Sequence, residues 1–521
     1  MKHDTLNPFY KLFLRLFDRR GFKYDGILNL YKINLDEANS LLCSKSADFW
    51  ETHGQEMALS LFHEAAESVP AYKDFLRKNN IKHTEIKTID DFKNVPFTDK
   101  ENYIKAYSSE ELSWDGKVEE NTIFSVSSGS SGTPYFWPRG DNLEIETSLI
   151  HALILKEFFD AGSTPTLVVI SFSMGIYIAG IITLDSILHT SQMGLPISII
   201  APGVELNDVL RAIKELGPKY NQIVLAGYPP FVKDIIDAGE KRGISWENQK
   251  IKFLFATENF SEAFRDYILS KTNATSAEST SINIYGSADS GILGHETPLS
   301  VAIRRAASED KDTASELWGD ETFTPTFVQY HPIFKFFEEQ EGELLFTARG
   351  GVPLVRYNVH DAGKIIPFDE VMKISSLASD QSVQKQPKWT FPFLAVFGKS
   401  DFTISFYGLK IYPENIKEGL ENEEVVPFAT GKFVMQQKSK SNQDQYWEIT
   451  VELREGVKES ALARKIVSDY IVAALRKRNL EYNRLYDAIG ERAIPSIRFA
   501  AKGDEKYFNV KSIKQRWTKK T

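Results

Sequence analysis

A run of small residues in the first third of the chain has the composition of a phosphate-binding loop. The segment Ser125-Val-Ser-Ser-Gly-Ser-Ser-Gly-Thr-Pro134 contains seven consecutive small residues. Gly129 and Gly132 permit positive φ, so consecutive backbone N–H groups can point into one concavity. Hydroxyl donors are added by Ser127, Ser128, Ser130, Ser131 and Thr133. The alternative is a flexible Ser/Gly linker, but a linker rarely lies between a β-like run and a helix within one domain.

Three familiar loop motifs of nucleotide-binding proteins and hydrolases are absent from the sequence. It contains no GxxxxGK[ST], no GxGxxG and no GxSxG. Gly398-Lys399-Ser400 resembles the end of a GxxxxGK[ST] loop, but Phe393 occupies the position that requires glycine. The Ser/Gly run therefore belongs to none of these motif classes.

Strand-like and helix-like segments alternate around the Ser/Gly run. This alternation predicts an α/β domain with a largely parallel sheet. The expected strands are Thr122–Val126, Thr166–Ser171, Ile197–Ile200, Gln222–Leu225, Lys252–Ala256 and Ser281–Tyr285. The expected helices are Glu56–Val69, Ala71–Asn79, Asp90–Phe92, Leu143–Phe159, Asn207–Leu216, Pro230–Arg242 and Ser261–Lys271. From Gly342 onward, Glu343–Thr347 and Leu354–Tyr357 are typical of antiparallel strands.

A second, smaller domain is expected after a polar, turn-rich segment, Ser375–Pro392. Its pattern is α+β, with helices at Pro413–Leu420 and Glu459–Lys477 and strands at Lys432–Gln437, Tyr446–Leu453 and Ser496–Ala500. The predicted organisation is a helical N-terminal extension (1–55), a large α/β domain (56–400) and a small α+β domain (401–521). Within the extension, the apolar spacing of residues 1–20 predicts an amphipathic helix docked on its own domain.

The overall composition is that of a globular protein in a reducing compartment, which favours the cytoplasm. Its single cysteine, Cys43, excludes an internal disulfide framework and a Cys-rich zinc site. The net charge of −9 gives no general nucleic-acid footprint. Residues 167–184 carry no charge over 18 positions, the lower limit for a spanning helix. A buried strand, a turn and a buried helix explain the same pattern, so we expect no stable membrane insertion.

Further segments form an ordered series with the Ser/Gly run. Residues 127–134 are similar to a loop written SSGTTGxP, and 353–361 are similar to PxxRYxxxD. The others are Val95–Lys100 (lPfTtK), Phe255–Glu258 (at a GGE position), Tyr285–Asp289 (YGxTE), Gly342–Thr347 (GELxxT) and 398–414 (GRxDD…RGxxxxPxxIE). In order and spacing this series resembles the adenylate-forming (ANL) superfamily, most of all its phenylacetate–CoA ligase branch. The resemblance extends over roughly residues 56 to 516.

The resemblance implies a reaction in two steps. A carboxylate attacks the α-phosphate of ATP to give acyl-AMP and pyrophosphate, and a thiol, usually coenzyme A, then takes the acyl group. The large domain would be the adenylation domain and the small one a mobile cap. Two negatively charged reactants require phosphate donors, Mg²⁺ and a cationic group at the α-phosphate.

The resemblance also implies a role for each matched residue. Asp289 would hold Mg²⁺, and Asp361 would accept from the ribose hydroxyls, although either could be an ordinary turn aspartate. Lys511 matches the C-terminal catalytic lysine, although a solvated basic tail is an equal alternative. Phosphates would be bound by Ser127, Ser128, Gly129, Ser130, Ser131, Gly132 and Thr133, and the adenine side would be formed by Tyr285 and Gly286. Arg356 would lie near the phosphates or in an ordinary ion pair, and Asp401 with Lys399 would form the interdomain hinge.

Several positions depart from the family's patterns. Thr133 replaces a Lys-like position, Ala288 replaces Thr or Ser, and Lys399 replaces the bidentate Arg. The glycines of GGE are absent at Ala256-Thr257. Thr297 stands where zinc-binding relatives have Cys, so we predict no structural metal. These departures leave open a specialised or weakened enzyme.

The substrate is expected to be an aryl or arylacetic acid of modest size. Aromatic and small residues occur together at Phe172–Tyr177 and Gly227–Pro230, where this family has its acyl pocket, although core packing alone explains part of this pattern. Three hypotheses remain: an acid–CoA ligase, an adenylating enzyme that transfers acyl groups to a carrier protein or amine, and a non-enzymatic nucleotide-binding protein.

Overall fold

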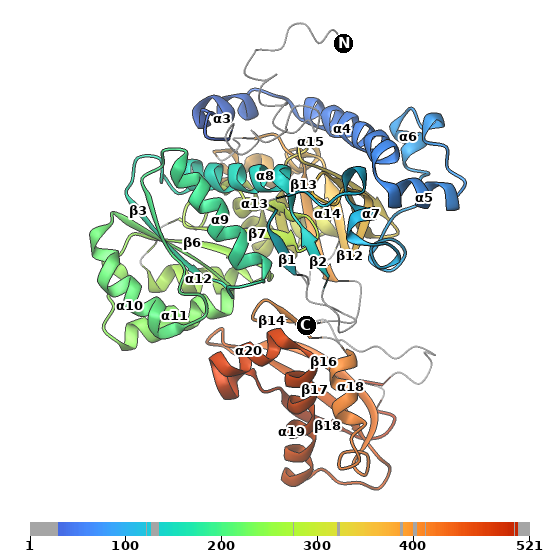
Figure 1. Ribbon diagram of the computed structural model, residues 1–521. Helices are drawn as coiled ribbons and strands as arrows, with labels where there is room; N and C mark the ends of the chain where they lie inside the picture. Colours follow the sequence, from blue (N-terminus) through green and yellow to red (C-terminus); the bar gives the residue numbers. More distant parts are fainter. Residues whose placement is uncertain are drawn as a thin grey trace, which may run out of the picture. The chain divides into compact units, whose positions relative to one another are not determined.

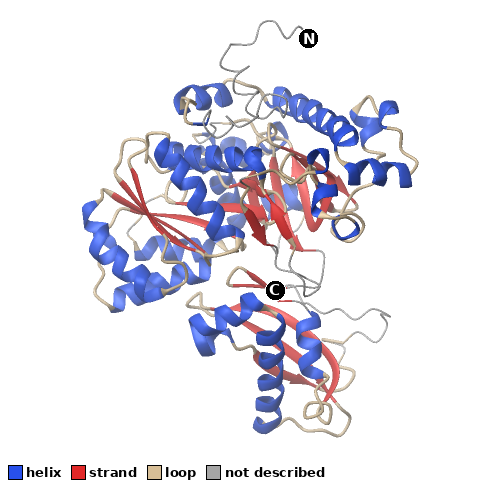
Figure 2. Ribbon diagram, in the orientation of Figure 1, coloured by secondary structure: helices blue, strands red, loops and turns tan. Residues whose placement is uncertain are grey.

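The computed structural model describes residues 30–120, 122–126, 135–272, 274, 276–319, 324–385, 389–399, 404–411, 413–504 and 506–508. The residues expected to form an amphipathic helix at the N-terminus, 1–20, lie outside this set. Apart from short segments, the chain divides into a larger unit before Asp401 and a smaller unit after Ser400. The predicted α/β class is confirmed by a large mixed sheet flanked by helices (Figures 1 and 2).

The central sheet of the larger unit has eleven strands among the described residues, in the order β10-β11-β12-β13-β9-β8-β7-β6-β5-β3-β4. Five are parallel: β3 (Thr166–Ser171), β4 (Ile197–Ile200), β5 (Gln222–Gly227), β6 (Ile251–Ala256) and β7 (Ser281–Ser287). Six are antiparallel to their neighbours: β8 (Gly291–His295), β9 (Thr326–Gln329), β10 (Lys335–Gln340), β11 (Glu343–Ala348), β12 (Leu354–Ile366) and β13 (Phe393–Lys399). Between β7 and β8 the pairing changes from parallel to antiparallel, and this change separates the parallel half of the sheet from its antiparallel half.

The parallel strands form the core because they are apolar on both faces. Every residue of β3 and β5 is buried, as expected for strands covered by helices on each side. The uncharged segment 167–184 consists of β3 and the start of helix α9 (Ile178–Gln192), as the pattern predicted. Within the described residues, no helix has both the length and the apolar character required to span a membrane.

Helices connect and cover these strands (Figure 1). The N-terminal helices are α3 (Leu35–Cys43), α4 (Ala47–Ser68), α5 (Pro70–Lys78), α6 (Ile89–Phe92) and α7 (Ser109–Leu112). The central ones are α8 (Gly140–Leu153), α9, α10 (Leu206–Leu216), α11 (Pro229–Lys241), α12 (Glu262–Lys271), α13 (Pro298–Glu309) and α14 (Lys311–Trp318). α13 begins with a capping box at Thr297 and with Pro298 at its first position, both strong start signals.

Two sequence expectations for the larger unit need correction. The Ser/Gly run was expected before a helix, but a short strand, β2 (Phe136–Pro138), comes first and pairs with β1 (Phe124–Val126). Residues 375–392, expected as turns, contain α16 (Ser375–Ser379) and α17 (Gln381–Gln384), which follow α15 (Phe368–Val371). These short helices escaped the sequence pattern because four or five residues are too few to show a period of 3.6.

The smaller unit contains a hairpin and a three-stranded sheet. The hairpin is β14 (Ile404–Phe406) with β15 (Leu409–Ile411), and the sheet is β16 (Ala429–Ser439), β17 (Gln445–Leu453) and β18 (Ser496–Ala500). Its helices are α18 (Pro413–Leu420), α19 (Ala461–Arg478) and α20 (Leu480–Ile489), the last of which the sequence analysis missed. A Cβ at Gly419 would lie 2.6 Å from the Cα of Ile471, so glycine permits the close packing of α18 on α19.

Candidate functional site

A hydrogen bond joins the last part of β7 to the middle of β12. The hydroxyl of Tyr285 donates to Oδ2 of Asp361 at 2.5 Å. In the sheet order β8, β9 and β13 lie between these two strands, and β8 joins β9 through a single register pair, His295↔Gln329. The bond therefore places two motifs side by side that are 76 residues apart in sequence.

The Tyr285 phenol remains protonated over the physiological pH range. Burial raises its pKa well above 10, and the neighbouring carboxylates of Asp361 and Asp289 raise it further. A protonated phenol can only donate to the carboxylate, so it orients Asp361. Because a carboxylate can accept several hydrogen bonds, this arrangement is compatible with Asp361 also accepting from a ligand hydroxyl.

The turn after β7 carries the other predicted adenine-side and magnesium residues. A Cβ at Gly286 would lie 2.7 Å from the carbonyl oxygen of Gly291, so this position requires glycine. The register between β7 and β8 shifts at this point, and Asp289 lies half-buried in the turn that follows. The structure thus brings together Tyr285, Gly286, Asp289 and Asp361, four of the predicted site residues.

Asp289 has suitable chemistry for the magnesium that the family implies. Mg²⁺ is usually held by one or two carboxylates together with substrate phosphates and water. Within the described residues there is no group of three or more His, Cys, Asp or Glu side chains that could hold a metal. A magnesium ion at Asp289 would therefore depend on the phosphates of the substrate for most of its ligands.

Arg356 lies on β12 but its guanidinium points into the protein. Nε donates to Oε2 of Glu338 at 3.0 Å, Nη2 donates to Gln340 at 3.1 Å, and Nη1 donates to the carbonyl oxygen of Val95. Only 4% of the residue is exposed. Of the two placements expected from the sequence, the structure shows the ion pair, and a role for Arg356 in catalysis stays a prediction.

The segment Val95–Lys100 packs against the same part of β12. Thr98 donates its backbone N–H to Arg356 and its hydroxyl to Val355, and it accepts from the N–H of Asn358. His360 lies between Glu343, at 3.1 Å, and Asp99, at 3.5 Å. Sequence reasoning missed this group of charged side chains, because its members come from three different motifs. It fixes the segment that leads to Asp361.

The predicted phosphate loop, the predicted catalytic lysine and one predicted hinge residue lie outside the described residues. The loop residues are Ser127, Ser128, Gly129, Ser130, Ser131, Gly132 and Thr133, the lysine is Lys511, and the hinge residue is Asp401. The strands on either side of the loop are described. Val126 of β1 pairs with Phe136 of β2, and the backbone N–H of Val126 donates to the carbonyl of Ile176. Lys399 lies at the end of β13 and pairs in register with Asp361.

Some non-glycine residues in the matched motifs have positive φ. Arg356 and His360 have φ of 46° and 59°, and Thr257, which follows β6, has φ of 77°. Such conformations are costly for residues other than glycine, most of all for a β-branched one. Thr257 occupies the position where the family has the second glycine of GGE, and this departure was the sequence signal that marked it.

His295, which lies near the zinc-binding segment of some relatives, belongs to the protein core. Its Nε2 is 2.9 Å from Nε2 of His331, and its Nδ1 is 2.7 Å from the carbonyl of Glu296. Thr297, at the zinc-binding cysteine position, donates to Gln329 and caps α13. Burial lowers the pKa of His295 to about 4, so the ring is neutral at pH 7.

Comparisons with known proteins show similarity in sequence and in fold. No family model matches the chain. The chain is 20% identical over 359 residues to the phenylacetate-coenzyme A ligase of Aromatoleum evansii. The aligned region covers 68% of this chain and 71% of that protein. A solved structure of 2-hydroxyisobutyryl-CoA ligase with 2-HIB-AMP and CoA matches 92% of this chain and 90% of its own, with a TM-score of 0.61 and 15% identity. The chain is thus similar in sequence to a phenylacetate-coenzyme A ligase and similar in fold to a 2-hydroxyisobutyryl-CoA ligase.

A second structure of that ligase shares the adenylate-forming fold. In an open conformation, also with 2-HIB-AMP and CoA, it matches 90% of this chain and 91% of its own, with a TM-score of 0.51 and 16% identity. These similarities extend over both the α/β and the α+β parts of the chain.

Proposed function

We propose that the protein is an AMP-forming ligase that activates a carboxylic acid with ATP and transfers the acyl group to coenzyme A. The observation that carries this proposal is the Tyr285–Asp361 hydrogen bond, which joins two segments that resemble motifs of the adenylate-forming family. The sequence relative is a phenylacetate-coenzyme A ligase, and the solved relative binds an acyl-AMP and CoA.

In the first step a carboxylate oxygen of the acid attacks the α-phosphorus of ATP. The bond between the α-phosphorus and the bridging oxygen breaks, and pyrophosphate leaves. Asp361 accepts hydrogen bonds from the ribose hydroxyls while Tyr285 holds its carboxylate in place. The Ser/Gly residues 127–133 would bind the phosphates, and Lys511 would supply the cationic group at the α-phosphate. Asp289 would hold Mg²⁺, which would supply positive charge that offsets the negative charge of the phosphates.

In the second step the thiol sulfur of coenzyme A attacks the acyl carbon, and AMP leaves as its phosphate oxygen takes the electron pair. Asp401 and Lys399 form the hinge about which the 401–521 domain rotates between the two steps. The protein would work in the cytoplasm on small molecules, without nucleic acid and without stable membrane insertion.

The acyl group is proposed to be aryl or arylacetic. Phe172–Tyr177 and Gly227–Pro230 each follow the end of a buried parallel strand, and β3 pairs with β5 through Ser171 and Gly227. Ligands of parallel α/β sheets bind at the carboxyl ends of the strands. Phe172 and Tyr177 are buried, and Ile176 is 46% exposed. Aromatic and small side chains at this edge suit a flat acid of modest size.

ATP–pyrophosphate exchange against a panel of aryl, arylacetic, short branched and fatty acids tests the function. Exchange with one acid class, followed by CoA-dependent release of AMP, is the expected result. Exchange without any effect of CoA would point to a carrier protein or an amine as the acceptor. Binding of ATP without exchange for any acid would contradict the enzymatic proposal and favour a non-enzymatic nucleotide-binding protein.

A further inference from the structure

The two residues of the Tyr285–Asp361 hydrogen bond are supported in different ways. Tyr285 lies on β7, two residues after Asn283, whose backbone N–H donates to Oε2 of Glu296 at 2.9 Å. Glu296 also accepts from Nη2 of Arg265 at 2.6 Å. The strand that carries Tyr285 is therefore held by charged groups of the interior.

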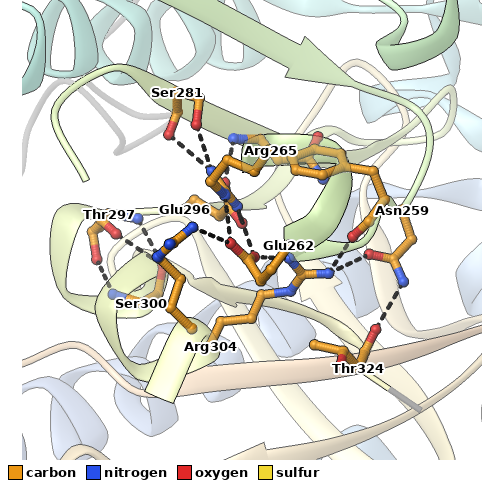
Figure 3. A network of polar contacts seen from close by, with 12 residues as sticks. Asn259, Glu262, Arg265, Ser281, Glu296, Thr297, Ser300, Arg304 and Thr324 are labelled. Carbon is orange, nitrogen blue, oxygen red and sulfur yellow. Dashed lines mark hydrogen bonds and ion pairs between the residues drawn. The ribbon is translucent and has the colours of Figure 1, made fainter. Parts of the chain in front are cut away.

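Arg265 belongs to a buried ionic network (Figure 3). Arg265 and Arg304 are each 1% exposed, and both bind Glu262. Figure 3 shows the two arginines converging on this carboxylate. The side-chain amide of Asn283 extends the network to the turn after β6, because it donates to the carbonyl of Glu258 at 3.2 Å. The support of β7 is thus closed to solvent.

Asp361 lies in a bulge of β12. Between the register pairs Glu343↔Ala362 and Leu345↔Asn358, β12 has three residues where β11 has one, and Asp361 is one of the three. A bulge bends its strand and changes the direction of its side chains, and bulges are common next to active sites. The shape of this bulge therefore determines where the carboxylate of Asp361 lies.

His360, in the same bulge, bridges two other segments of the chain. Its Nδ1 lies 3.1 Å from Oε2 of Glu343 on β11, and its Nε2 lies 3.5 Å from Oδ2 of Asp99. The backbone N–H of His360 donates to the side chain of Asn358 at 2.7 Å, and the amide of Asn358 donates to the same Glu343 oxygen at 2.7 Å. These contacts tie the bulge to β11 and to the segment Val95–Lys100.

The backbone at position 360 does not by itself require histidine. With a φ of 59°, the position suits glycine or asparagine at least as well. Histidine adds a ring whose two nitrogens both face carboxylate oxygens. Because 41% of the side chain is exposed, the ring fills little of the apolar core. Its main contribution is the polar bridge.

We propose that His360 is a positioning residue for nucleotide binding. By bridging Glu343 and Asp99, it holds the bulge in the shape that presents the carboxylate of Asp361 to the ribose hydroxyls. Tyr285 fixes the rotation of that carboxylate, and the bridge fixes the backbone from which it extends. His360 acts through Asp361 and does not itself contact the nucleotide. The inference rests on the proposed use of ATP and on the ribose role proposed for Asp361.

Binding of AMP and of 2′,3′-dideoxy-AMP to the full-length protein, measured by titration calorimetry, tests the inference without knowledge of the acid. The wild type should bind AMP about 10- to 100-fold more tightly, because only AMP has hydroxyls that donate to a carboxylate. His360→Gly permits the positive φ and removes both ring contacts. Its affinity for AMP should fall about 3- to 10-fold, whereas its affinity for dideoxy-AMP should stay within about twofold of the wild type.

Two further variants separate the bridge from the backbone. His360→Asn tolerates the same φ, and its amide can donate to Glu343 from near the position of Nδ1, so affinity for AMP should return to within about threefold of the wild type. Asn80→Gly is the matched control, because it places glycine at another exposed position of positive φ, 57°. It should bind both nucleotides as the wild type does.

The preference for AMP over dideoxy-AMP distinguishes positioning from a merely structural role. An equal loss of affinity for both nucleotides in His360→Gly, or a lower urea midpoint with an unchanged preference, would overturn the role of His360 while leaving the proposed ligase activity intact. A wild type that binds both nucleotides equally would remove Asp361 from the ribose site and the inference with it. Absence of AMP binding by the wild type would overturn the proposed use of ATP as well.

Discussion

Tyr285 donates its hydroxyl to Asp361 across 2.5 Å, although the two residues belong to opposite halves of the same sheet. The sheet is continuous from the parallel strand β7 to the antiparallel strand β12, and β8 and β9 join its two halves through the single register pair His295↔Gln329. Burial keeps the Tyr285 hydroxyl protonated, so it donates a hydrogen bond. Asp361 accepts this bond, which fixes the orientation of its carboxylate. The nucleotide site proposed here is organised around this pair.

Removing the phenol hydroxyl should weaken nucleotide binding more gently than removing the carboxylate. Tyr285→Phe loses one positioning hydrogen bond, so the KM for ATP in pyrophosphate exchange should rise about 3- to 10-fold. Asp361→Asn removes the negative charge and replaces one of the two acceptor oxygens proposed for the ribose hydroxyls with an NH₂ donor; because hydrogen bonds to a charged group are stronger, its KM should rise about 10- to 100-fold. An unchanged KM in Asp361→Asn would remove this residue from the ribose site.

Lys511→Ala should abolish adenylation while the protein stays folded. The proposed reason is loss of the cationic group at the α-phosphate, where charge develops in the transition state. Pyrophosphate exchange and far-UV circular dichroism measure the two properties. Lys519→Ala is the matched control from the same basic segment and should retain exchange. Unchanged exchange in Lys511→Ala would remove this lysine from the mechanism and favour a solvated tail.

The ion pair of Arg356 should contribute to stability and not to chemistry. Arg356→Met leaves the carboxylate of Glu338 buried without its partner and should destabilise the fold by about 3–5 kcal/mol in urea unfolding. Replacing both residues, Arg356→Met with Glu338→Met, should recover most of that stability and should retain pyrophosphate exchange. A stable double variant with no exchange would instead support a catalytic Arg356.

The network of Figure 3 should depend on the charge of Glu262. Although burial raises the pKa of this carboxyl, Arg265 and Arg304 together lower it to about 2, so its stabilising effect is complete above the unfolded pKa of about 4.5 and lost as pH falls toward 2. Glu262→Gln leaves buried Arg304 without its carboxylate partner and Arg265 with Glu296 alone, and it should cost about 3–5 kcal/mol of unfolding free energy. Asp266→Asn, on the exposed side of Arg305, is the control and should cost below about 1 kcal/mol.

Acid should destabilise the protein through its buried histidines. Burial lowers the pKa of His295 and His151 to about 4 and that of His331 well below 6.5. The unfolded chain therefore binds protons first, so stability present above about pH 6.5 is lost as pH falls toward 4. His331→Phe should reduce the slope of unfolding free energy below pH 6.5 by up to about 1.4 kcal/mol per pH unit.

The control for this measurement is Phe391→Leu. The Phe391 ring lies 4.7 Å from that of His331, so this change disturbs the same packing without removing a titrating group. It should lower the urea midpoint equally at pH 7.5 and pH 5. If His331→Phe gave the same pH slope as the wild type, the buried imidazole would not be responsible for the acid sensitivity.

Local patterns in the sequence were sufficient for most of the fold. The strands at Thr166–Ser171, Ile197–Ile200 and Ser496–Ala500 and the helix at Pro413–Leu420 have the predicted bounds, because apolar runs and proline start signals act within a few residues. β12 was expected to end at Tyr357 and continues to Ile366. Its second half alternates small, polar and apolar residues, and it becomes a strand by pairing with β13, which lies 27 residues further on.

The sequence alone determined which residues to consider: the ordered motifs marked Tyr285, Gly286, Asp289, Arg356 and Asp361, and the family resemblance of those motifs implied nucleotide chemistry. Only the tertiary structure decided what their side chains do. Asp361 receives the Tyr285 hydroxyl because the sheet brings distant strands together, and Arg356 turns into the core toward Glu338. Thr257 is strained because a buried network fixes the residues beside it. Residue type is local information, whereas orientation depends on contacts between segments far apart in the chain.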